Sequence, residues 1–357
     1  MLEDKPKYEA GLIETSKSSI KLKALREFIT KYYFRETMNF WDKLRSYFKQ
    51  EELFILDVNF KRDYPLRYPV DFVTNRDSWE KVLLDQNGIP IKYYRNKIQY
   101  NPTRIAGYAL KLLKIYLDTR NIDFYDKFMV VSNWFINNIR VKNNYGRYEY
   151  DEYYEDLKEP WISGMAQGQA ISVLTRAYLL SRKDIYLDVA NLAMNSLIQP
   201  LEEGGVLFKK KLNDRVLIFF EEVPSKNPTH ILNGNIYSMI AIYDYLTVCD
   251  LLGKEPQQHD LRLIFNLSVE TLKLFLPLYD TSYWSRYDIK TIASYHYHWI
   301  HIVQLEALYK LLDIKEFLFW SKKFRSYTSS KYNCMKALSK KFLEKSMWGW
   351  RRWRREK

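Results

Sequence analysis

The chain has 357 residues, of which 47% are hydrophobic and 17% aromatic. This composition is too apolar for a disordered protein and predicts a sizeable folded core. No apolar run approaches the roughly 20 residues needed to span a bilayer. Residues 1–7 are charged and no apolar stretch follows them, so we recognise no secretory signal. Two cysteines, Cys249 and Cys334, are too few for a disulfide framework or a four-cysteine metal site. We therefore expect a cytoplasmic protein.

The net charge of +13 is concentrated at the C-terminus. Residues 321–357 hold 13 Lys and Arg against two acids, whereas the preceding 320 residues hold 43 basic and 41 acidic residues. The body of the protein is therefore nearly neutral. No helix-turn-helix, zinc-finger or RNA-binding signature accompanies the basic segment. We do not expect a nucleic-acid partner.

The N-terminal hundred residues predict a helix followed by short strands. Leu22, Leu25, Phe28 and Tyr32 have helical spacing and favour an amphipathic helix within residues 22–48. Residues 53–100 contain prolines, a glycine and short apolar runs, which is typical of strands and turns. We expect an N-terminal helical extension over residues 1–50 and a small β region over 51–100.

From Pro102 onward a helical period dominates. Pro102 suits the first turn of a helix that continues past Tyr116. Further helices are predicted over residues 124–141, 163–180, 184–198, 232–252, 261–276, 293–312 and from 315. Helices joined in sequential hairpins favour an α/α toroid or partial barrel over residues 101–328. The sequence alone does not close such a ring, and it shows no motif repeated at a fixed period.

Glu222 is a candidate for proton transfer. It follows the apolar residues 216–220, a predicted strand that would deliver its carboxyl group into a partly desolvated cleft. Burial would raise the pKa of Glu222 toward a range useful for catalysis. The alternative is a carboxylate at a strand end that faces water or pairs with the lysines of residues 209–211.

Residues 295–301 hold three of the five histidines. His298 and His301 are three residues apart, so they share a face if this segment begins a helix. A zinc site is less expected than a role in orienting substrate or a tyrosine, because no acid–histidine helix motif accompanies them.

Amide and aromatic side chains near apparent helix starts are candidates for sugar binding. Gln167, Gln169 and Asn233 could bind sugar hydroxyls or cap helices. Trp161 could stack on a sugar ring or belong to the core.

Several segments in consistent order carry a family resemblance. They are Tyr100-Asn101-Pro102, WISGMAQGQAIS at residues 161–172, EEVP at 221–224, ILNG at 231–234, LPLYDT at 276–281, RYDI at 286–289 and YHWIH at 297–301. Their order and spacing resemble the C-terminal domain of D-glucuronyl C5-epimerases, over roughly two thirds of the chain. These enzymes convert glucuronic to iduronic acid within a polysaccharide.

The resemblance implies a mainly α fold, an incomplete α/α barrel with a small β region N-terminal to it. It implies epimerisation of a uronic acid in an acidic polysaccharide or lipid-linked glycan. Glu222, Tyr287 and Tyr297 match catalytic positions. Matching or neighbouring positions are expected to bind substrate: Tyr100, Trp161, Gln167, Gln169, Asn233, Arg286, Lys290, His298 and His301. No cofactor or metal is expected, because the carboxylate itself makes the C5 proton acidic.

Two positions depart from the family pattern. Val223 stands where the family usually has a tyrosine, and Lys290 where it has an arginine. A lysine offers a point charge in place of a forked guanidinium. A polysaccharide lyase that starts with the same C5 proton abstraction, and a non-catalytic glycan-binding relative, therefore stay open as alternatives.

The segment 329–357 is a distinct basic, Trp-rich tail. Trp348, Trp350 and Trp353 are interspersed with Lys and Arg, a composition suited to an anionic membrane surface. An acidic polysaccharide partner and a solvated, disordered end are the alternatives. A homodimer is compatible with the sequence.

Overall fold

The computed structural model describes residues 47, 49, 52–72, 82–94, 97–151, 157 and 160–355, with side chains up to Met347 except those of residues 94 and 97. Its described part is mainly helical, with small antiparallel two-stranded sheets. The helix predicted within residues 22–48 lies outside the described residues except for Tyr47, which is buried.

The predicted β region contains short extended pairings. Isolated bridges join Leu56 to Val70 and Leu84 to Pro90. A small hairpin follows, made of β1 (Lys92–Tyr94) and β2 (Lys97–Gln99). The strand and turn texture expected of this region is thus found in its described residues.

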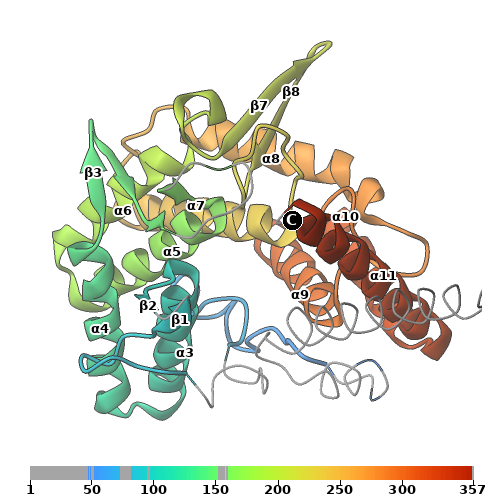
Figure 1. Cartoon of the computed structure of the whole chain (residues 1–357). Helices are drawn as coiled ribbons and strands as arrows, with labels where there is room; N and C mark the ends of the chain where they lie inside the picture. Colours follow the sequence, from blue (N-terminus) through green and yellow to red (C-terminus); the bar gives the residue numbers. More distant parts are fainter. Residues whose placement is uncertain are drawn as a thin grey trace, which may run out of the picture.

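Helices make up most of the remaining chain and follow one another in an arc (Figure 1). They are α3 (Pro102–Thr119), α4 (Ile122–Asn137), α5 (Gly164–Ser181), α6 (Asp184–Leu197), α7 (Leu232–Leu251), α8 (Leu261–Phe275), α9 (Tyr295–Leu312), α10 (Lys315–Thr328) and α11 (Lys331–Arg355). Short 3-10 turns occur at Leu201–Glu203 and Leu276–Tyr279. Pro102 begins α3 as predicted, and the Asn101 side chain caps it by accepting a bond from the backbone N–H of Arg104.

One predicted helix ends earlier than expected. The sequence predicts a helix up to residue 141, but α4 ends at Asn137 because residues 140–142 form a strand of a β-hairpin. Strand β3 (Arg140–Lys142) forms an antiparallel hairpin with β4 (Tyr145–Arg147). The next two strands, β5 (Glu149–Tyr150) and β6 (Trp161–Ile162), pair across the polar loop.

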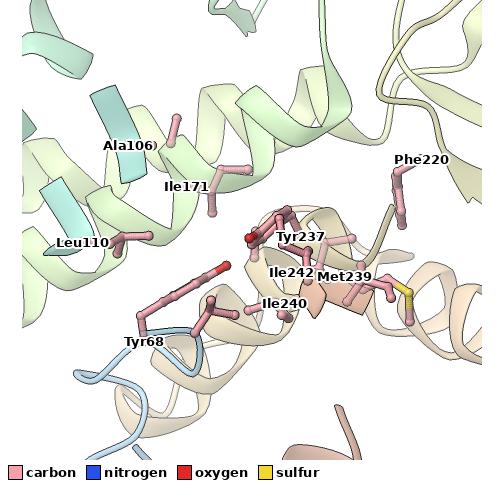
Figure 2. Packing of buried hydrophobic residues seen from close by; sticks show 14 of the residues in the cluster. Tyr68, Ala106, Leu110, Ile171, Phe220, Tyr237, Met239, Ile240 and Ile242 are labelled. Atoms are coloured by element: carbon pink, nitrogen blue, oxygen red, sulfur yellow. The ribbon is translucent and has the colours of Figure 1, made fainter. Parts of the chain in front are cut away.

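Helices α5 and α7 form the centre of the core. Most residues of both are buried, so neither shows the single apolar stripe of a surface helix. Their axes approach closely where Gly168 faces Ser238, since a Cβ at Gly168 would lie 2.9 Å from the Ser238 Cα. Figure 2 shows Ile171 of α5 and Tyr237, Ile240 and Ile242 of α7 among these buried side chains.

The longest hairpin carries the chain toward the site. Strand β7 (Leu207–Leu212) pairs with β8 (Arg215–Phe220), with Leu207 opposite Phe220. Backbone N–H groups of β8 are held by side chains of neighbouring helices: Ile218 donates to Thr271 Oγ1 of α8, and Phe220 to Asn235 Oδ1 of α7, both at 2.9 Å. The end of β8 is therefore fixed relative to the start of α7.

Helix α11 packs on the domain at its N-terminal half, where Cys334 and Ala337 are buried. Tyr332, Leu343 and Met347 are exposed on its outer side. The described part of the chain contains no helix long and apolar enough to cross a membrane.

A buried ion pair ties α5 to α7. The guanidinium of Arg176 forms a forked pair with the Asp244 carboxylate at 2.6 and 3.0 Å, and neither side chain is exposed. Tyr64 and Ser172 hydroxyls donate to the same carboxylate, at 2.6 and 2.7 Å. The ring of Tyr68 lies 4.9 Å from the guanidinium carbon.

We predict that Asp244→Asn lowers the free energy of unfolding by about 3–5 kcal/mol, because Arg176 would stay buried without a counter-charge. Urea unfolding followed by circular dichroism measures this loss. Asp250→Asn near the end of the same helix is the matched control. Asp250 pairs with Arg262 at the surface, so its loss is expected to cost less than about 1 kcal/mol. Equal effects of the two variants would contradict the prediction.

Candidate active site

The site begins where β8 ends, because two consecutive carboxylates there face in different directions. Glu221 is fully buried and structural: its Oε1 lies 2.5 Å from His230 Nδ1, and its Oε2 accepts a bond from the His230 backbone N–H at 3.2 Å. Its backbone carbonyl accepts a bond from the N–H of Gly164 at the start of α5. These contacts leave Glu222 to face the first turn of α7.

Glu222 is held between α7 and the loop that precedes α9. One carboxylate oxygen accepts a bond from Asn233 Nδ2 and the other from the Tyr287 hydroxyl, each at 3.2 Å. Gly234 makes this approach feasible, since a Cβ at that position would lie 2.6 Å from Glu222 Cβ and Oε2. The predicted placement of Glu222, Asn233 and Tyr287 in one site is thus found in the structure.

The carboxyl group of Glu222 is an unusually weak acid. Burial raises the pKa of Glu222 to about 7, and the nearby charge of Glu221 adds to this rise, although the hydrogen bonds from Tyr287 and Asn233 oppose it. Part of the residue still reaches solvent. Near neutral pH this group can therefore either accept or donate a proton.

Tyrosines surround this carboxyl group. Tyr287 and Tyr297 lie with ring centroids 4.5 Å apart at an interplanar angle of 50°. Tyr297 stands in the first turn of α9, where its backbone N–H donates to the side chain of the N-cap residue Ser294. The two predicted catalytic tyrosines therefore lie together, and Tyr287 donates a hydrogen bond to Glu222.

A third tyrosine belongs to this cluster and was not predicted. Tyr237 is 1% exposed, and its pKa is raised by burial and by its neighbours Tyr297 and Glu222. Figure 2 shows its hydroxyl turned toward that of Tyr68. A sequence signal existed: Tyr237 follows Asn233 by four residues, so the two share one face of α7.

Arg286 and Lys290 line a surface cavity of about 430 Å³, to which Glu222, Tyr287 and Tyr297 do not contribute. The cavity lies between the loop of residues 280–292 and α11, which contributes Lys340 and Glu344. The two lining carboxylates have internal partners: Asp280 pairs with Lys323 at 2.7 Å, and Glu344 accepts from the Ile292 N–H. The cavity thus presents cations to solvent.

The histidines were predicted to contact substrate, and their geometry is against this. Both are fully buried. His298 Nδ1 accepts from the Ser285 N–H at 3.1 Å, its Nε2 lies 3.0 Å from the carbonyl oxygen of Phe324, and its ring stacks on Trp284. Both ring nitrogens of His298 therefore have hydrogen-bond partners inside the core, and neither is available to a ligand.

Burial also keeps these imidazoles neutral. It lowers the pKa of His298 to about 3 and holds that of His301 well below its usual value. His301 Nδ1 lies 2.9 Å from Ser285 Oγ, while its Nε2 has no hydrogen-bond partner among the described residues. The described residues contain no group of His, Cys, Asp and Glu arranged to hold a metal ion.

The other predicted binding residues lie in different surroundings. Gln167 and Gln169 of α5 are buried, and Gln167 donates to the Tyr148 carbonyl at 3.1 Å. Trp161 stacks on Tyr150 with ring centroids 4.7 Å apart. Tyr100 is 41% exposed and donates its hydroxyl proton to Asp85 at 2.8 Å. The contacts of Gln167 and Tyr100 named here join neither residue to the tyrosine cluster.

A cation that sequence reasoning missed stands over Tyr287. The Nζ of Lys341, on α11, lies 5.7 Å from the centroid of the Tyr287 ring. Nothing in the local sequence could have indicated this contact, because more than fifty residues separate the two positions.

Comparisons with known proteins match this part of the chain. A model of the family described as D-glucuronyl C5-epimerase C-terminus matches residues 138–326, more than half of the chain and all of the Glu222–tyrosine cluster. An uncharacterized protein of Methanocaldococcus jannaschii is 29% identical over 180 residues, 50% of this chain and 56% of that protein. The D-glucuronyl C5-epimerase of Caenorhabditis elegans is 32% identical over 164 residues, 42% of this chain and 26% of that protein.

We predict that Glu222→Gln stabilises the protein at alkaline pH. The folded state keeps the Glu222 proton up to a pH of about 7, whereas an unfolded chain releases it near 4.5. The folded state therefore binds more protons between these values, and its stability falls as the pH rises. Relative to wild type, the variant should gain about 2–3 kcal/mol in free energy of unfolding between pH 4 and pH 8.

Urea unfolding at a series of pH values measures this gain. Glu202→Gln, at an exposed position, is the control and should follow the wild-type pH dependence. A pH-independent difference between Glu222→Gln and wild type would show that the carboxyl group is not desolvated as described.

Proposed function

Because the chain belongs to the D-glucuronyl C5-epimerase C-terminus family, we propose that it inverts C5 of a uronic acid residue within a polysaccharide or lipid-linked oligosaccharide. The reaction would be the conversion of D-glucuronate to L-iduronate or its counterpart in a related uronic acid. The observation that carries the proposal is the hydrogen bond between Tyr287 and the high-pKa carboxyl group of Glu222, beside Tyr297.

The chemistry requires two proton-transfer groups on opposite faces of the sugar ring. One takes the C5 proton, and the electron pair left behind delocalises into the adjacent carboxylate as an enediolate. The other returns a proton to C5 from the opposite face, so that the net change is one of configuration alone. We assign these roles to Glu222 and Tyr297, with Tyr287 supporting Glu222. The two roles can be exchanged between the opposing groups.

The pKa of Glu222 suits this task. A base whose pKa lies near the working pH combines a useful fraction of the reactive form with enough proton affinity. A carboxyl group near 7 meets both conditions at neutral pH, whereas an ordinary glutamate would be a weaker base. Burial of the site also strengthens any interaction with charge that develops on the substrate.

Cations are needed where the substrate carboxylate gains enediolate character. We propose that Arg286 and Lys290 bind this group or a neighbouring carboxylate of the polymer, since both line a cavity on the loop that also carries Tyr287. Lys290 stands where the family has an arginine, so it would contribute charge without a forked contact. Neutralisation by these side chains and the intrinsic acidity of C5 require no cofactor in this scheme.

The sequential helix hairpins also support an incomplete α/α toroid, which stays a prediction. The chain covers 56% and 26% of the two relatives described above. The substrate polymer and the compartment in which it is met are therefore proposals, as are membrane contact through α11 and self-association.

Solvent exchange at C5 tests the proposal directly. Incubated in deuterated water with glucuronate-containing oligosaccharides, the wild-type protein should place deuterium at C5, detected by NMR, with new iduronate signals. Glu222→Gln should abolish the labelling, and Tyr297→Phe should reduce it by about 100-fold or more, as expected for loss of a general acid or base.

The products separate the competing functions. An unsaturated product that absorbs ultraviolet light would identify a lyase, because elimination across C4–C5 follows the same proton abstraction. Saturable glycan binding with no label at C5 in any of several uronic-acid polymers would instead favour a glycan-binding relative.

We predict that Lys290→Met raises KM for the oligosaccharide by about 3- to 10-fold, as expected for loss of one solvent-exposed charge contact. Lys290→Arg should keep or lower KM, because a guanidinium retains the charge and adds a forked contact. Lys210→Met, which removes an exposed lysine of β7, is the matched control for net charge. Equal changes in KM for Lys290→Met and Lys210→Met would refute a local role for Lys290.

A further inference from the structure

Helix α11 lies beyond the family-matched stretch, which ends at residue 326. It nevertheless packs against the loop that carries Tyr287. Figure 1 shows α11 running beside α9 and α10 toward the middle of the molecule. Its buried residues Cys334 and Ala337 hold the helix on the domain, and the next two turns bring Lys341 and Glu344 to the loop.

The two α11 side chains hold both backbone polar groups of one loop residue. Lys341 Nζ donates to the Ile292 carbonyl oxygen at 2.6 Å. The Ile292 N–H donates to the Glu344 carboxylate, whose oxygens lie 3.1 and 3.3 Å away. Charged groups make the stronger hydrogen bonds to backbone, so this is a firm two-point attachment.

Ile292 is the residue through which this attachment reaches Tyr287. It pairs with Arg286 in an antiparallel bridge, and the Tyr287 N–H donates to the Thr291 carbonyl at 2.9 Å. Residues 286–292 thus form a tight hairpin with Tyr287 on one arm and Ile292 on the other. Displacement of Ile292 would move the arm that carries the Tyr287 hydroxyl.

The opposite edge of the hairpin is held by the region that carries Glu222's other partner. The Tyr287 carbonyl accepts a bond from the N–H of Leu232 at 3.0 Å, and the Ile289 N–H donates to Thr229 at 3.2 Å. The hairpin is therefore fixed between the start of α7 on one side and α11 on the other. This same hairpin carries the Tyr287 hydroxyl that donates to Glu222 at 3.2 Å.

We propose that Lys341 and Glu344 are positioning residues for Tyr287, so that α11 completes the active site from outside the family-matched region. The proposal rests on the proposed function, because it assigns these residues to the geometry of proton transfer. Lys341 adds a second effect, since its ammonium group lies over the Tyr287 ring and faces the electron density of the phenol.

The test compares Lys341→Met with Lys341→Arg, Glu344→Ala and the control Lys331→Met, which removes an exposed lysine at the start of the same helix. C5 exchange gives kcat and KM for each variant, and amide hydrogen exchange reports on residues 286–292. Melting temperatures identify any variant that fails to fold. Glu344→Ala removes the other half of the attachment and serves in place of Lys341→Met if the latter does not fold.

We expect Lys341→Met to lower kcat by about 10- to 100-fold with KM within about twofold, as for a catalytic group displaced by a fraction of an ångström to an ångström. Lys341→Arg should recover most of kcat, because it keeps both the charge and a donor to the Ile292 carbonyl. Amides of residues 286–292 should exchange faster in Lys341→Met and Glu344→Ala than in wild type, and Lys331→Met should match wild type.

Unchanged kcat together with unchanged amide protection in the folded Lys341→Met and Glu344→Ala variants would overturn the proposal. If the wild type labels no uronic-acid polymer at C5, the proposed function fails. The amide-exchange measurement still tests whether Lys341 and Glu344 hold residues 286–292 in place. Faster exchange of residues 286–292 would then support α11 as the element that holds this hairpin, and unchanged exchange would refute it.

Discussion

The separation of two adjacent carboxylates is the constraint on which the candidate site depends. The Glu221 carboxyl group contacts His230, and its backbone carbonyl accepts a bond from the start of α5. The Glu222 carboxyl group instead contacts Asn233 of α7 and Tyr287. The two groups occupy different surroundings: Glu221 is held by contacts inside the protein, whereas the pKa of Glu222 is raised to about 7. The hairpin β7–β8 and the helix starts around it serve to keep this distinction.

Chain segments that are distant in sequence meet at Glu222 through helix and strand ends. The end of β8 supplies the carboxyl group, the first turns of α7 supply Asn233 and Tyr237, and the first turn of α9 supplies Tyr297. Ends of elements carry backbone groups without internal partners, so polar side chains gather there at little cost to the core. The tyrosine cluster is thus a product of the helix arrangement.

Much of the helical fold was predictable because apolar residues recur at helical spacing from α3 to α10. The place of Glu222 at a strand end was predictable because an apolar run precedes it, whereas its proposed role and those of Tyr287 and Tyr297 were inferred from family motifs. His298 and His301 were expected to contact substrate, and the structure buries both. Their spacing indicates a shared helix face but not whether that face meets solvent or core. Tyr237 is one of 30 tyrosines, and the contact of Lys341 with Tyr287 depends on tertiary packing that no local pattern encodes.

The pleat of β8 has an evolutionary consequence. Successive side chains of an extended segment point to opposite sides, so the loss or gain of a single residue within β8 would move Glu222 out of the position that faces Tyr287. A gain would place Glu221 there and a loss would place Val223 there, with the hairpin itself still formed. Length variation among relatives is therefore tolerable at the turn of Asn213 and Asp214, where the hairpin reverses, and harmful a few residues later. An alignment gap inside this strand would mark a descendant that kept the architecture and lost the chemistry.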